Sequence, residues 1–402
     1  MASTTRAPGL GVFGGMGLVV KLLLLAPPQV LFNLVRCYTF ALFRGISFRH
    51  YAQCAFYRFA LHRLTPRQLQ AVSPSTLATY KAWLPRRQSR AAAQTKRAGS
   101  QDKEPAFLAS HLAVDIEQLP DGRSSLMWIG NRHKATKFVL FFHGGGYIAP
   151  AMNGHMEWCL RAYLLASPAI SGAGNDEEVA VAFLQYTLCP DAVYPETLQQ
   201  AMDAMAHLFA SGRVTPANLV IGGDSAGGNL TAQVLGHLLR PHPDVRRVPL
   251  AEPLAGAFLV SPLLSVRNDW PSVARNGGID MLSSTTTDRL IPWVLGPTTF
   301  QVELKQQKGW CMPMDVEDPV AWHTGLEKVA KEVYVTVGQQ EIFLDQGVAY
   351  ADAIRRASPG VTVKLDASTD EAHDWILMEG DKGIDGDATQ RMRDWVRGVF
   401  WP

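Results

Sequence analysis

The pattern of hydrophobic and polar positions divides the chain into three parts. The first 45 residues are mostly apolar: Leu10 to Val35 contains fifteen Leu, Val or Phe residues and a single charge, Lys21. Residues 46–83 are rich in aromatic residues and arginine, and the breaks at Pro66 and Pro74 predict short helices there. Beyond residue 110, short apolar runs alternate with longer amphipathic stretches. This alternation predicts strands separated by helices.

The alternating part predicts an α/β fold, with a mostly parallel sheet covered by helices on both faces. Buried strands are expected at Phe138 to Phe142, Val179 to Leu184, Leu219 to Ile221, Ala257 to Val260, Val333 to Val337 and Val361 to Leu365. A strand pair, Leu112 to Leu119 and Ser125 to Ile129, is expected before them. Helices are expected at Pro195 to Ala210, Asn229 to Leu239 and Gln346 to Ala357.

Two stretches depart from this rhythm. Pro85 to Pro105 is polar, basic and Ala-rich without apolar periodicity, which predicts a linker. Ser265 to Val320 is long, contains Trp and Pro, and falls between two predicted strands, which indicates an insertion above the sheet. We therefore interpret residues 1–45 as a hydrophobic anchor and 46–110 as N-terminal helices and linker that form part of a cap. Residues 111–402 are then the α/β domain, with a cap insertion at about 265–320.

Composition and charge exclude several classes of protein. The chain has 402 residues, and 38 basic against 36 acidic residues give a formal net charge of +2. No global basic excess attracts nucleic acid, so no nucleic-acid partner is expected. The five cysteines are scattered without a C-x-x-C pair, which argues against a disulfide framework and a Cys-rich zinc site.

The apolar N-terminal segment predicts a membrane anchor that either spans the bilayer or lies in one leaflet. A helix of this length could cross a hydrocarbon core of about 30 Å, and its apolar residues outweigh Lys21 on insertion scales. No small-x-small cleavage site follows cleanly, so a removed signal peptide fits poorly. The alternative is an apolar helical arm packed on the α/β domain. Arg6 precedes the segment and several arginines follow it, a charge bias that favours a cytoplasmic domain.

The sequence Gly223-Asp-Ser-Ala-Gly227 matches the G-x-S-x-G nucleophile elbow. It follows a predicted strand and precedes a predicted helix, as that motif requires. The turn exposes the serine hydroxyl at the N-terminus of the helix, where unpaired N–H groups face the reacting centre. Ser225 is therefore the candidate nucleophile.

A second glycine-rich motif, His143-Gly-Gly-Gly146, follows the strand that ends at Phe142. Glycines let backbone N–H groups point into a cavity, where they can stabilise the oxyanion of a tetrahedral intermediate. We expect the N–H groups of Gly144, Gly145 and Ala226 to form this oxyanion hole. We expect His143 to hold the loop through a hydrogen bond rather than to act as a base.

A general base and an acid should follow the serine in the order Ser, acid, His. His373 is the only histidine beyond the last two predicted strands, so elimination makes it the base. The acid should follow the strand Val333 to Val337. Glu341 is preferred because it lies nearer the strand end, and Asp345 is the alternative, since it could instead be a charge at the start of the next helix.

Together these motifs resemble the hormone-sensitive lipase family of α/β-hydrolases, from about residue 110 to the end. The resemblance rests on the His143 and Ser225 motifs, Tyr186-Thr-Leu-Cys-Pro190 with Tyr194-Pro195, and the Glu341 and His373 segments. It implies an eight-stranded sheet, a helical cap, and hydrolysis of carboxylic esters without a cofactor or metal. The family's usual acid is an aspartate followed by proline, so Glu341 departs from the pattern and Asp345 stays open.

The expected function is therefore a serine esterase that acts on an apolar, possibly acetylated, small-molecule ester such as a sterol, lipid or secondary metabolite. The hydrophobic segment is similar to those of membrane-anchored deacetylases and steryl acetyl hydrolases of that family. This similarity implies an endoplasmic reticulum or other endomembrane location, with sidedness open because such enzymes commonly face the lumen. Two alternatives remain: an acyltransferase that uses the same acyl-enzyme, and a non-catalytic binding protein on the same fold.

Overall fold

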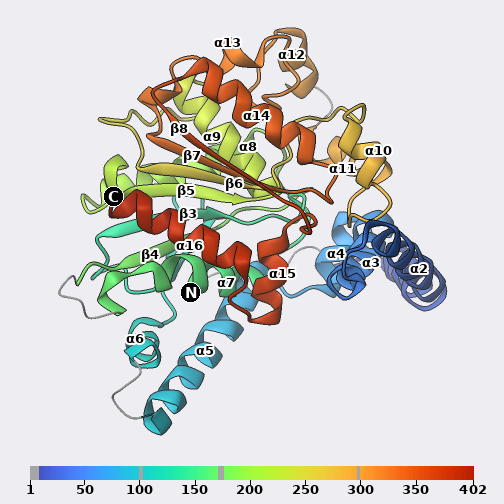
Figure 1. Ribbon diagram of the computed structural model, residues 1–402, viewed down its shortest axis with the longest axis horizontal. Helices are drawn as coiled ribbons and strands as arrows, with labels where there is room; N and C mark the ends of the chain where they lie inside the picture. Colours follow the sequence, from blue (N-terminus) through green and yellow to red (C-terminus); the bar gives the residue numbers. More distant parts are fainter. Residues whose placement is uncertain (1–8, 99–102, 171–175, 297–298) are drawn as a thin grey trace.

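The computed structural model describes residues 9–98, 103–170, 176–296 and 299–402. Its centre is one eight-stranded sheet with the strand order β1-β2-β4-β3-β5-β6-β7-β8. Strands β3 to β8 run parallel, and β2 pairs antiparallel with both β1 and β4. The predicted α/β architecture with a mostly parallel eight-stranded sheet is confirmed. Figure 1 shows the sheet between two layers of helices.

A strand lies within or over every predicted range. The largest difference is at Leu112 to Leu119, of which only Ile116–Gln118 forms a strand, while β5 and β8 each end three residues later than predicted. The strands are β1 (Ile116–Gln118), β2 (Ser125–Ile129), β3 (Lys137–Phe142), β4 (Val179–Gln185), β5 (Leu219–Asp224), β6 (Gly256–Val260), β7 (Glu332–Gly338) and β8 (Thr362–Ser368). The side chains of β2, β4, β5 and β6 are buried almost throughout, because helices cover both faces of the sheet.

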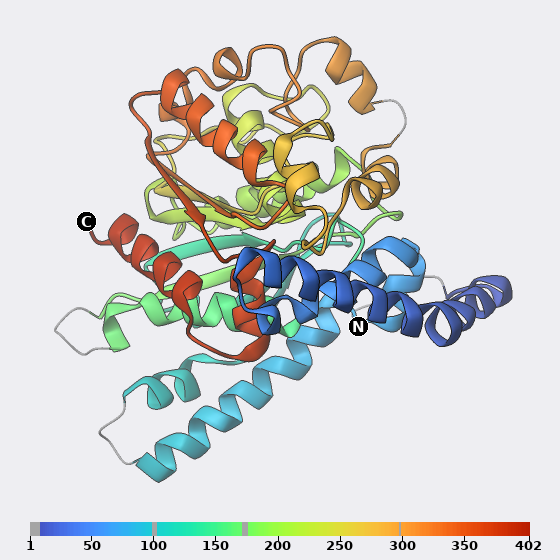
Figure 2. The same cartoon turned by 45° about the vertical axis from the view of Figure 1, so that its right-hand side comes forward.

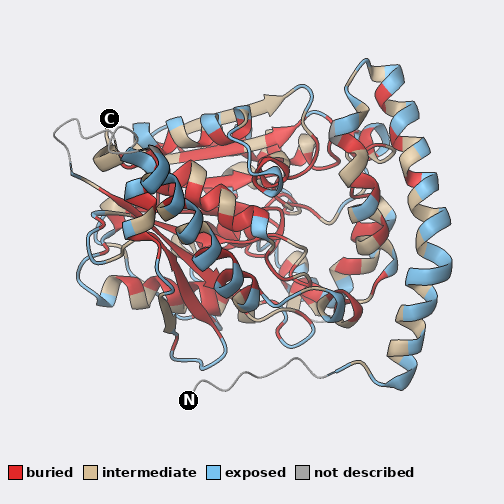
Figure 3. Ribbon diagram, turned by 90° about the horizontal axis from the view of Figure 1, so that it is seen from below, coloured by how far each residue is buried: buried red, intermediate tan, exposed pale blue. Residues whose placement is uncertain are grey.

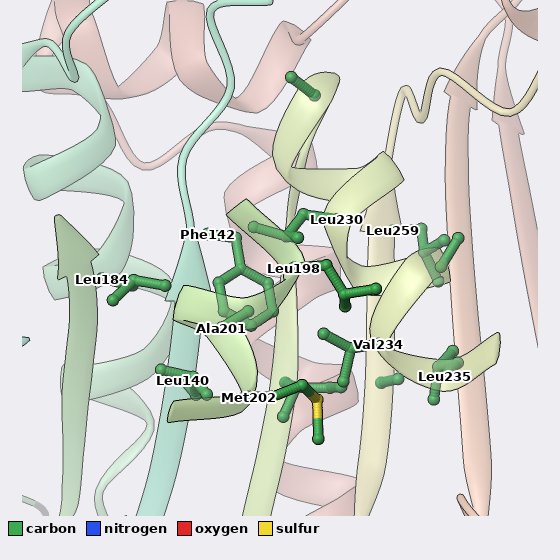
Figure 4. Packing of buried hydrophobic residues seen from close by; sticks show 14 of the residues in the cluster. Leu140, Phe142, Leu184, Leu198, Ala201, Met202, Leu230, Val234, Leu235 and Leu259 are labelled. Atoms are coloured by element: carbon green, nitrogen blue, oxygen red, sulfur yellow. The ribbon is translucent and has the colours of Figure 1, made fainter. Parts of the chain in front are cut away.

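One face of the sheet is covered by α8 (Glu196–Ala210), α9 (Ala226–Leu239) and α14 (Leu344–Ala357), and the other by α7 (Asn153–Trp158), α15 (Trp375–Lys382) and α16 (Asp387–Phe400). Figure 4 shows part of the first layer: Leu198 and Met202 of α8 and Leu230 and Val234 of α9 lie in one buried cluster with Leu140 and Phe142 of β3. This packing fixes the start of α9, and therefore the turn at Ser225, relative to the ends of the parallel strands.

Between β6 and β7 the chain leaves the sheet and forms α10 (Pro271–Asn276), α11 (Ser284–Leu295), α12 (Thr299–Lys305) and α13 (Pro319–His323). The predicted insertion at about 265–320 therefore corresponds to a helical excursion. The predicted breaks at Pro66 and Pro74 are also found, since they separate α3 (Phe48–Arg63), α4 (Pro66–Val72) and α5 (Thr76–Ala98).

The linker prediction for Pro85 to Pro105 is wrong where the structure describes it. Residues 85–98 continue helix α5, and Lys103–His111 forms α6, while residues 99–102 lie outside the described part. Alanine and arginine favour a helix, and α5 is held by one narrow stripe in which Tyr80, Leu84 and Ala91 are buried. The Tyr80 hydroxyl donates to the carbonyl of Trp128 at 2.6 Å, which fixes α5 to β2. The division into anchor, cap and α/β domain stays a prediction.

The apolar N-terminal segment forms α1 (Val12–Val20), a π-helical turn η1 (Lys21–Leu25) and α2 (Ala26–Arg44). These run on as one helix of 33 residues, the one helix within the described ranges that is long and apolar enough to cross a membrane. A signal sequence would meet the same criterion. Arg6, which entered the prediction of orientation, lies outside the described residues. Figure 2 shows this helix, in dark blue, running beside α3 and α4.

Candidate active site

Ser225 lies on a tight turn between β5 and α9. Its backbone has φ 51° and ψ −109°, a conformation that non-glycine residues rarely adopt. The flanking glycines are required by close packing, because a Cβ on either Gly223 or Gly227 would lie 1.9 Å from the carbonyl oxygen of Phe142. The Ser225 N–H donates to the Val260 carbonyl at 2.8 Å, which ties the turn to β6.

The structure brings Ser225, His373 and Glu341 together. Nε2 of His373 lies 3.0 Å from Oγ of Ser225, and Nδ1 of the same ring lies 3.1 Å from Oε2 of Glu341. Glu341 follows β7 and His373 follows β8, so neighbouring parallel strands place both at one edge of the sheet. All three residues are buried.

Asp345 lies elsewhere. It is in the first turn of α14, where its Oδ2 accepts the Ser272 N–H at 2.6 Å and its Oδ1 lies 3.4 Å from Nη2 of Arg275. A carboxylate at this position is favoured by the helix dipole. Of the two candidate acids, the structure places only Glu341 beside His373.

One of the three predicted oxyanion-hole residues is wrong. The Gly144 N–H donates to Oδ1 of Asp224 at 3.0 Å and is therefore occupied. Gly145 and Gly146 adopt positive φ angles of 97° and 61°, and both line the cavity beside Ser225 and Ala226. Gly146 belongs to the same glycine motif as Gly144. The sequence does not indicate which N–H groups of this motif lack a hydrogen-bond acceptor within the protein.

Asp224 links the glycine loop to the turn that carries Ser225. Besides accepting from Gly144, it lies with Oδ2 at 3.2 Å from Nε2 of His155, whose Nδ1 accepts the Met152 N–H at 3.0 Å. Asp224 is fully buried. This network was not predicted, although Asp224 lies inside the elbow motif and a buried carboxylate there requires partners.

His143 holds the loop as expected. Its Nδ1 lies 2.8 Å from the Gly144 carbonyl oxygen, and its ring stacks on Tyr186 with the centroids 4.4 Å apart. Burial, with a smaller effect of neighbouring His155, lowers the pKa of His143 to about 3. The ring is therefore neutral and takes a structural place in the loop.

Two further buried carboxyl groups surround His373. Oδ2 of Asp374 lies 3.2 Å from Nε2 of His373, and Oδ1 of Asp374 has no hydrogen-bond partner in the described part of the chain. Burial raises the pKa of Asp374 well above its usual value, and burial likewise raises the pKa of Asp280 to about 6. Burial alone would lower the pKa of His373, but Asp374 and Glu341 outweigh it and raise that pKa to about 10.

A cavity of about 390 Å³ opens over Ser225 and His373. Apart from the site residues, its walls are largely aliphatic and aromatic, and they come from the N-terminal helices and from α11 as well as from the elements around the sheet. The lining includes Leu61, Leu64 and Leu69 of the N-terminal helices, Leu290 and Val294 of α11, and Tyr147, Met312 and Phe343. Within the described ranges no cluster of His, Cys, Asp or Glu could hold a metal ion.

Comparison with known proteins identifies the architecture. Residues 139–377 match a family model described as the alpha/beta hydrolase fold. An ethyl acetate hydrolase from Pseudomonas putida is 26% identical over 61% of this chain and 70% of its own length. Esterase LipI from Mycobacterium tuberculosis is 23% identical over 63% of this chain and 70% of its own length. Carboxylic ester hydrolase LipN from the same organism is 25% identical, over 57% of this chain and 55% of its own length.

Solved structures show the same fold. An esterase from the bacterial hormone-sensitive lipase family superimposes with a TM-score of 0.53 at 22% identity, over 79% of this chain and 98% of the other. A fungal esterase from Rhizomucor miehei superimposes with a TM-score of 0.54 at 19% identity, over 82% and 92% of the two chains.

Proposed function

We propose that this chain, a member of the alpha/beta hydrolase family matched at residues 139–377 and a carboxylic-ester hydrolase like its relatives, is of the hormone-sensitive lipase type and works through an acyl-enzyme on Ser225. The observation that carries the proposal is the unbroken line from Ser225 Oγ through the His373 ring to Glu341, at distances of 3.0 and 3.1 Å. A serine hydroxyl is a weak nucleophile until an adjacent base takes its proton.

In the first half-reaction His373 accepts the Ser225 proton at Nε2 while Oγ attacks the ester carbonyl carbon. Glu341 accepts the hydrogen bond from Nδ1–H, which fixes the tautomer and stabilises the imidazolium that forms. His373 then returns the proton to the departing alcohol. In the second half-reaction a water molecule takes the place of the alcohol, gives a proton to Nε2 of His373 and attacks the acyl carbonyl carbon. His373 then returns the proton to Oγ of Ser225 as the carboxylic acid leaves. No metal or cofactor takes part in these steps.

The negative charge that develops on the carbonyl oxygen needs donors that are already in position. The N–H groups of Gly145, Gly146 and Ala226 suit this role, because all three residues line the cavity beside Ser225. Asp224 supports the arrangement indirectly, since it holds the loop through the Gly144 N–H. Each donor is worth about 10²–10³ in rate in comparable enzymes.

The substrate is an apolar small-molecule ester. The cavity walls are mostly aliphatic, so they offer few hydrogen bonds and favour partition of an apolar molecule from water. The exposed apolar helix 12–44 supports a second part of the proposal, association of the enzyme with a membrane. Such a membrane would also hold the substrate.

A fluorophosphonate probe, followed by peptide mass spectrometry, tests the nucleophile. We expect one labelled serine, Ser225, with labelling abolished in Ser225→Ala and strongly reduced in His373→Ala. Ser211→Ala, at an exposed position that follows α8 and is absent from the cavity lining, is the control and should label normally. Ester turnover should fall by roughly 10⁴–10⁶ in Ser225→Ala with the fold unchanged. Labelling at another serine, or normal turnover in Ser225→Ala, would overturn the proposal.

A further inference from the structure

The helix formed by residues 12–44 turns most of its polar side chains, and all of its charged ones, toward the protein. Nζ of Lys21 donates to Oε1 of Gln68 at 2.8 Å, and Nδ2 of Asn33, which is buried, donates to the Ala55 carbonyl at 3.1 Å. The helix contains no acidic residue, and none of its basic residues is in the exposed class. Lys21, Gln29 and Asn33 thus bind residues of α3 and α4, and Arg44 binds Asn276 of α10. Tyr38 and Thr39 are the polar residues of the helix in the exposed class.

The opposite face of the same helix is apolar and open. Phe13 is 90% exposed and Phe43 is 85% exposed, at the two ends of the helix. The other large exposed side chains between them include Met16, Val19, Leu23, Leu24, Leu31, Phe32, Val35 and Leu42. A surface helix of a water-soluble domain has the reverse arrangement, with apolar residues inside and charges outside. Figure 3 shows this helix at the edge of the molecule, with its exposed residues in pale blue.

The helix is attached to the protein near both ends. Near its start, the Gly14 carbonyl accepts from Nε2 of Gln68 at 3.2 Å. At its end, Nη1 of Arg44 donates to Oδ1 of Asn276 at 2.9 Å. A helix of 33 residues is about 50 Å long at 1.5 Å per residue. It therefore cannot cross a hydrocarbon core of about 30 Å unless the segments that are hydrogen-bonded to it also enter the membrane.

Helix α3 would enter the membrane together with a spanning α2. It pairs antiparallel with α2: the side chain of Asn33 reaches Ala55, and Nη2 of Arg63 donates to Oε1 of Gln29 at 2.7 Å. A spanning helix would carry Arg58 and Arg63 to hydrocarbon depth. An arginine at the centre of a membrane helix is strongly disfavoured. The attachments therefore favour a helix that lies along the membrane.

The cavity over Ser225 reaches the surface beside the apolar face. Leu22 lines the cavity and is 40% exposed, and Val72 also lines it and is 47% exposed. A residue that both lines the cavity and meets solvent lies at the cavity mouth. The mouth is thus bordered by apolar side chains, one of which belongs to helix 12–44.

We propose that helix 12–44 lies parallel to the membrane surface with its outer face in one leaflet, and that the ester passes from this leaflet into the cavity at Leu22. This proposal rests on the proposed esterase function for its catalytic consequence. A lipid leaflet explains the apolar outer face, the inward polar groups and the position of the mouth together.

Depth measurements test the orientation of the helix. The native cysteines are all buried, so a cysteine introduced at Phe13, Leu24 or Phe43 can be labelled selectively with a fluorophore. In phosphatidylcholine vesicles brominated at stepped acyl positions, we expect all three labels to be quenched at the same shallow depth. Arg356→Cys, at an exposed position of α14, is the control and should not be quenched. A Leu24 label quenched much deeper than both end labels would show a spanning helix and overturn the proposal.

Activity measurements test the route of the ester. The double variant Leu24→Glu/Phe32→Glu changes only the outer face and leaves the cavity lining intact. We expect it to hydrolyse water-soluble p-nitrophenyl acetate normally, and a long-chain ester embedded in phosphatidylcholine vesicles at least tenfold more slowly. Val302→Glu, an exposed apolar position on α12, is the matched control and should retain both activities.

The outcomes separate the two proposals. No p-nitrophenyl acetate hydrolysis by the folded wild-type enzyme would count against the esterase mechanism, while the quenching depths would still report on the helix. If the double variant hydrolysed the embedded ester as fast as the wild type does, entry from the leaflet would be overturned. Sedimentation as a dimer that vesicles do not dissociate would show that a second copy covers the apolar face, and would also overturn the proposal.

Discussion

Oδ2 of Asp374 lies 3.2 Å from Nε2 of His373, the same nitrogen that faces Oγ of Ser225 at 3.0 Å. The Asp374 backbone makes this possible, because its φ of 54° turns the side chain back toward the preceding histidine. A carboxylate at this position stabilises the protonated ring, and together with Glu341 it raises the pKa of His373 to about 10. Asp374 thus opposes the neutral form that a general base requires.

Asp374→Asn should therefore lower the pH at which the enzyme becomes active. His373 accepts the serine proton only when neutral, so activity is lost as the pH falls below its pKa, and a raised pKa moves this loss to higher pH. The substitution removes one of the charges that raise the pKa, and asparagine tolerates the left-handed conformation. We expect the acidic limb of the kcat/KM profile to shift toward lower pH by about one unit or more.

Asp370→Asn is the control for this shift, because it removes an exposed carboxylate in the same loop. Its profile should match that of the wild type. An unchanged acidic limb in Asp374→Asn would show that Asp374 carries no charge in the active enzyme.

Glu341→Gln should mainly lower turnover, whereas Asp345→Ala should mainly lower stability. Glutamine cannot stabilise the imidazolium, and the corresponding change in a related triad lowers kcat by about 10⁴. Asp345→Ala should change kcat by no more than a few-fold. It should instead lower the free energy of unfolding by about 1–2 kcal/mol, because the Ser272 N–H loses its acceptor.

Steady-state kinetics and urea unfolding of both variants measure the two effects. If Asp345→Ala lost more activity than Glu341→Gln, the acid would be Asp345 and the observed pairing of Glu341 with His373 would have no catalytic meaning.

Asp224→Asn should lower kcat without a large change in KM. Asp224 does not line the cavity, yet it accepts from Gly144 and faces His155. In this variant the side-chain NH₂ group would face the N–H of His155. Two hydrogen-bond donors repel each other, so the side chain should turn and the glycine loop should lose its fixed position. A fall in kcat of roughly 10–10³-fold is expected if the neighbouring oxyanion donors shift.

The fluorophosphonate reaction provides a second measurement for Asp224→Asn. The label should still attach to Ser225, only more slowly, because the nucleophile and its base remain. A rise in KM with unchanged kcat would show instead that Asp224 shapes substrate binding.

The sequence predicted the fold because alternating apolar and amphipathic runs report directly on buried strands and covering helices. It also named Ser225, Glu341 and His373, because motif order limited the choices, and these residues lie together in the structure. It could not assign the oxyanion donors. The motif offers several glycine N–H groups, and the one at Gly144 is taken by a carboxylate whose direction depends on the packing of β3 against β5.

The second half of helix α5, residues 85–98, was missed for a different reason. Periodicity detects a helix by a broad apolar face, whereas α5 buries only a narrow stripe and ends in an Ala- and Arg-rich stretch.

The sequence also left open whether the apolar N-terminal segment spans a membrane or lies along it. Its composition is the same in both cases, and only the contacts made by Gly14, Asn33 and Arg44 favour one orientation.

A last prediction concerns the wall of the cavity that α3 forms. Ala60 of α3 is half-buried and lines the cavity, so Ala60→Phe should fill part of the roughly 390 Å³ space. An ester with a long or bulky apolar group needs this space, whereas an acetate ester of a small alcohol fits beside Ser225 without it. We expect kcat/KM for a bulky ester to fall tenfold or more, with little change for p-nitrophenyl acetate.

Ala52→Phe, on the same helix with similar exposure but outside the cavity lining, is the control and should leave both rates unchanged. An equal loss for both esters in Ala60→Phe would show that α3 supports the fold of the site rather than the substrate, and would leave the α11 wall to determine substrate size.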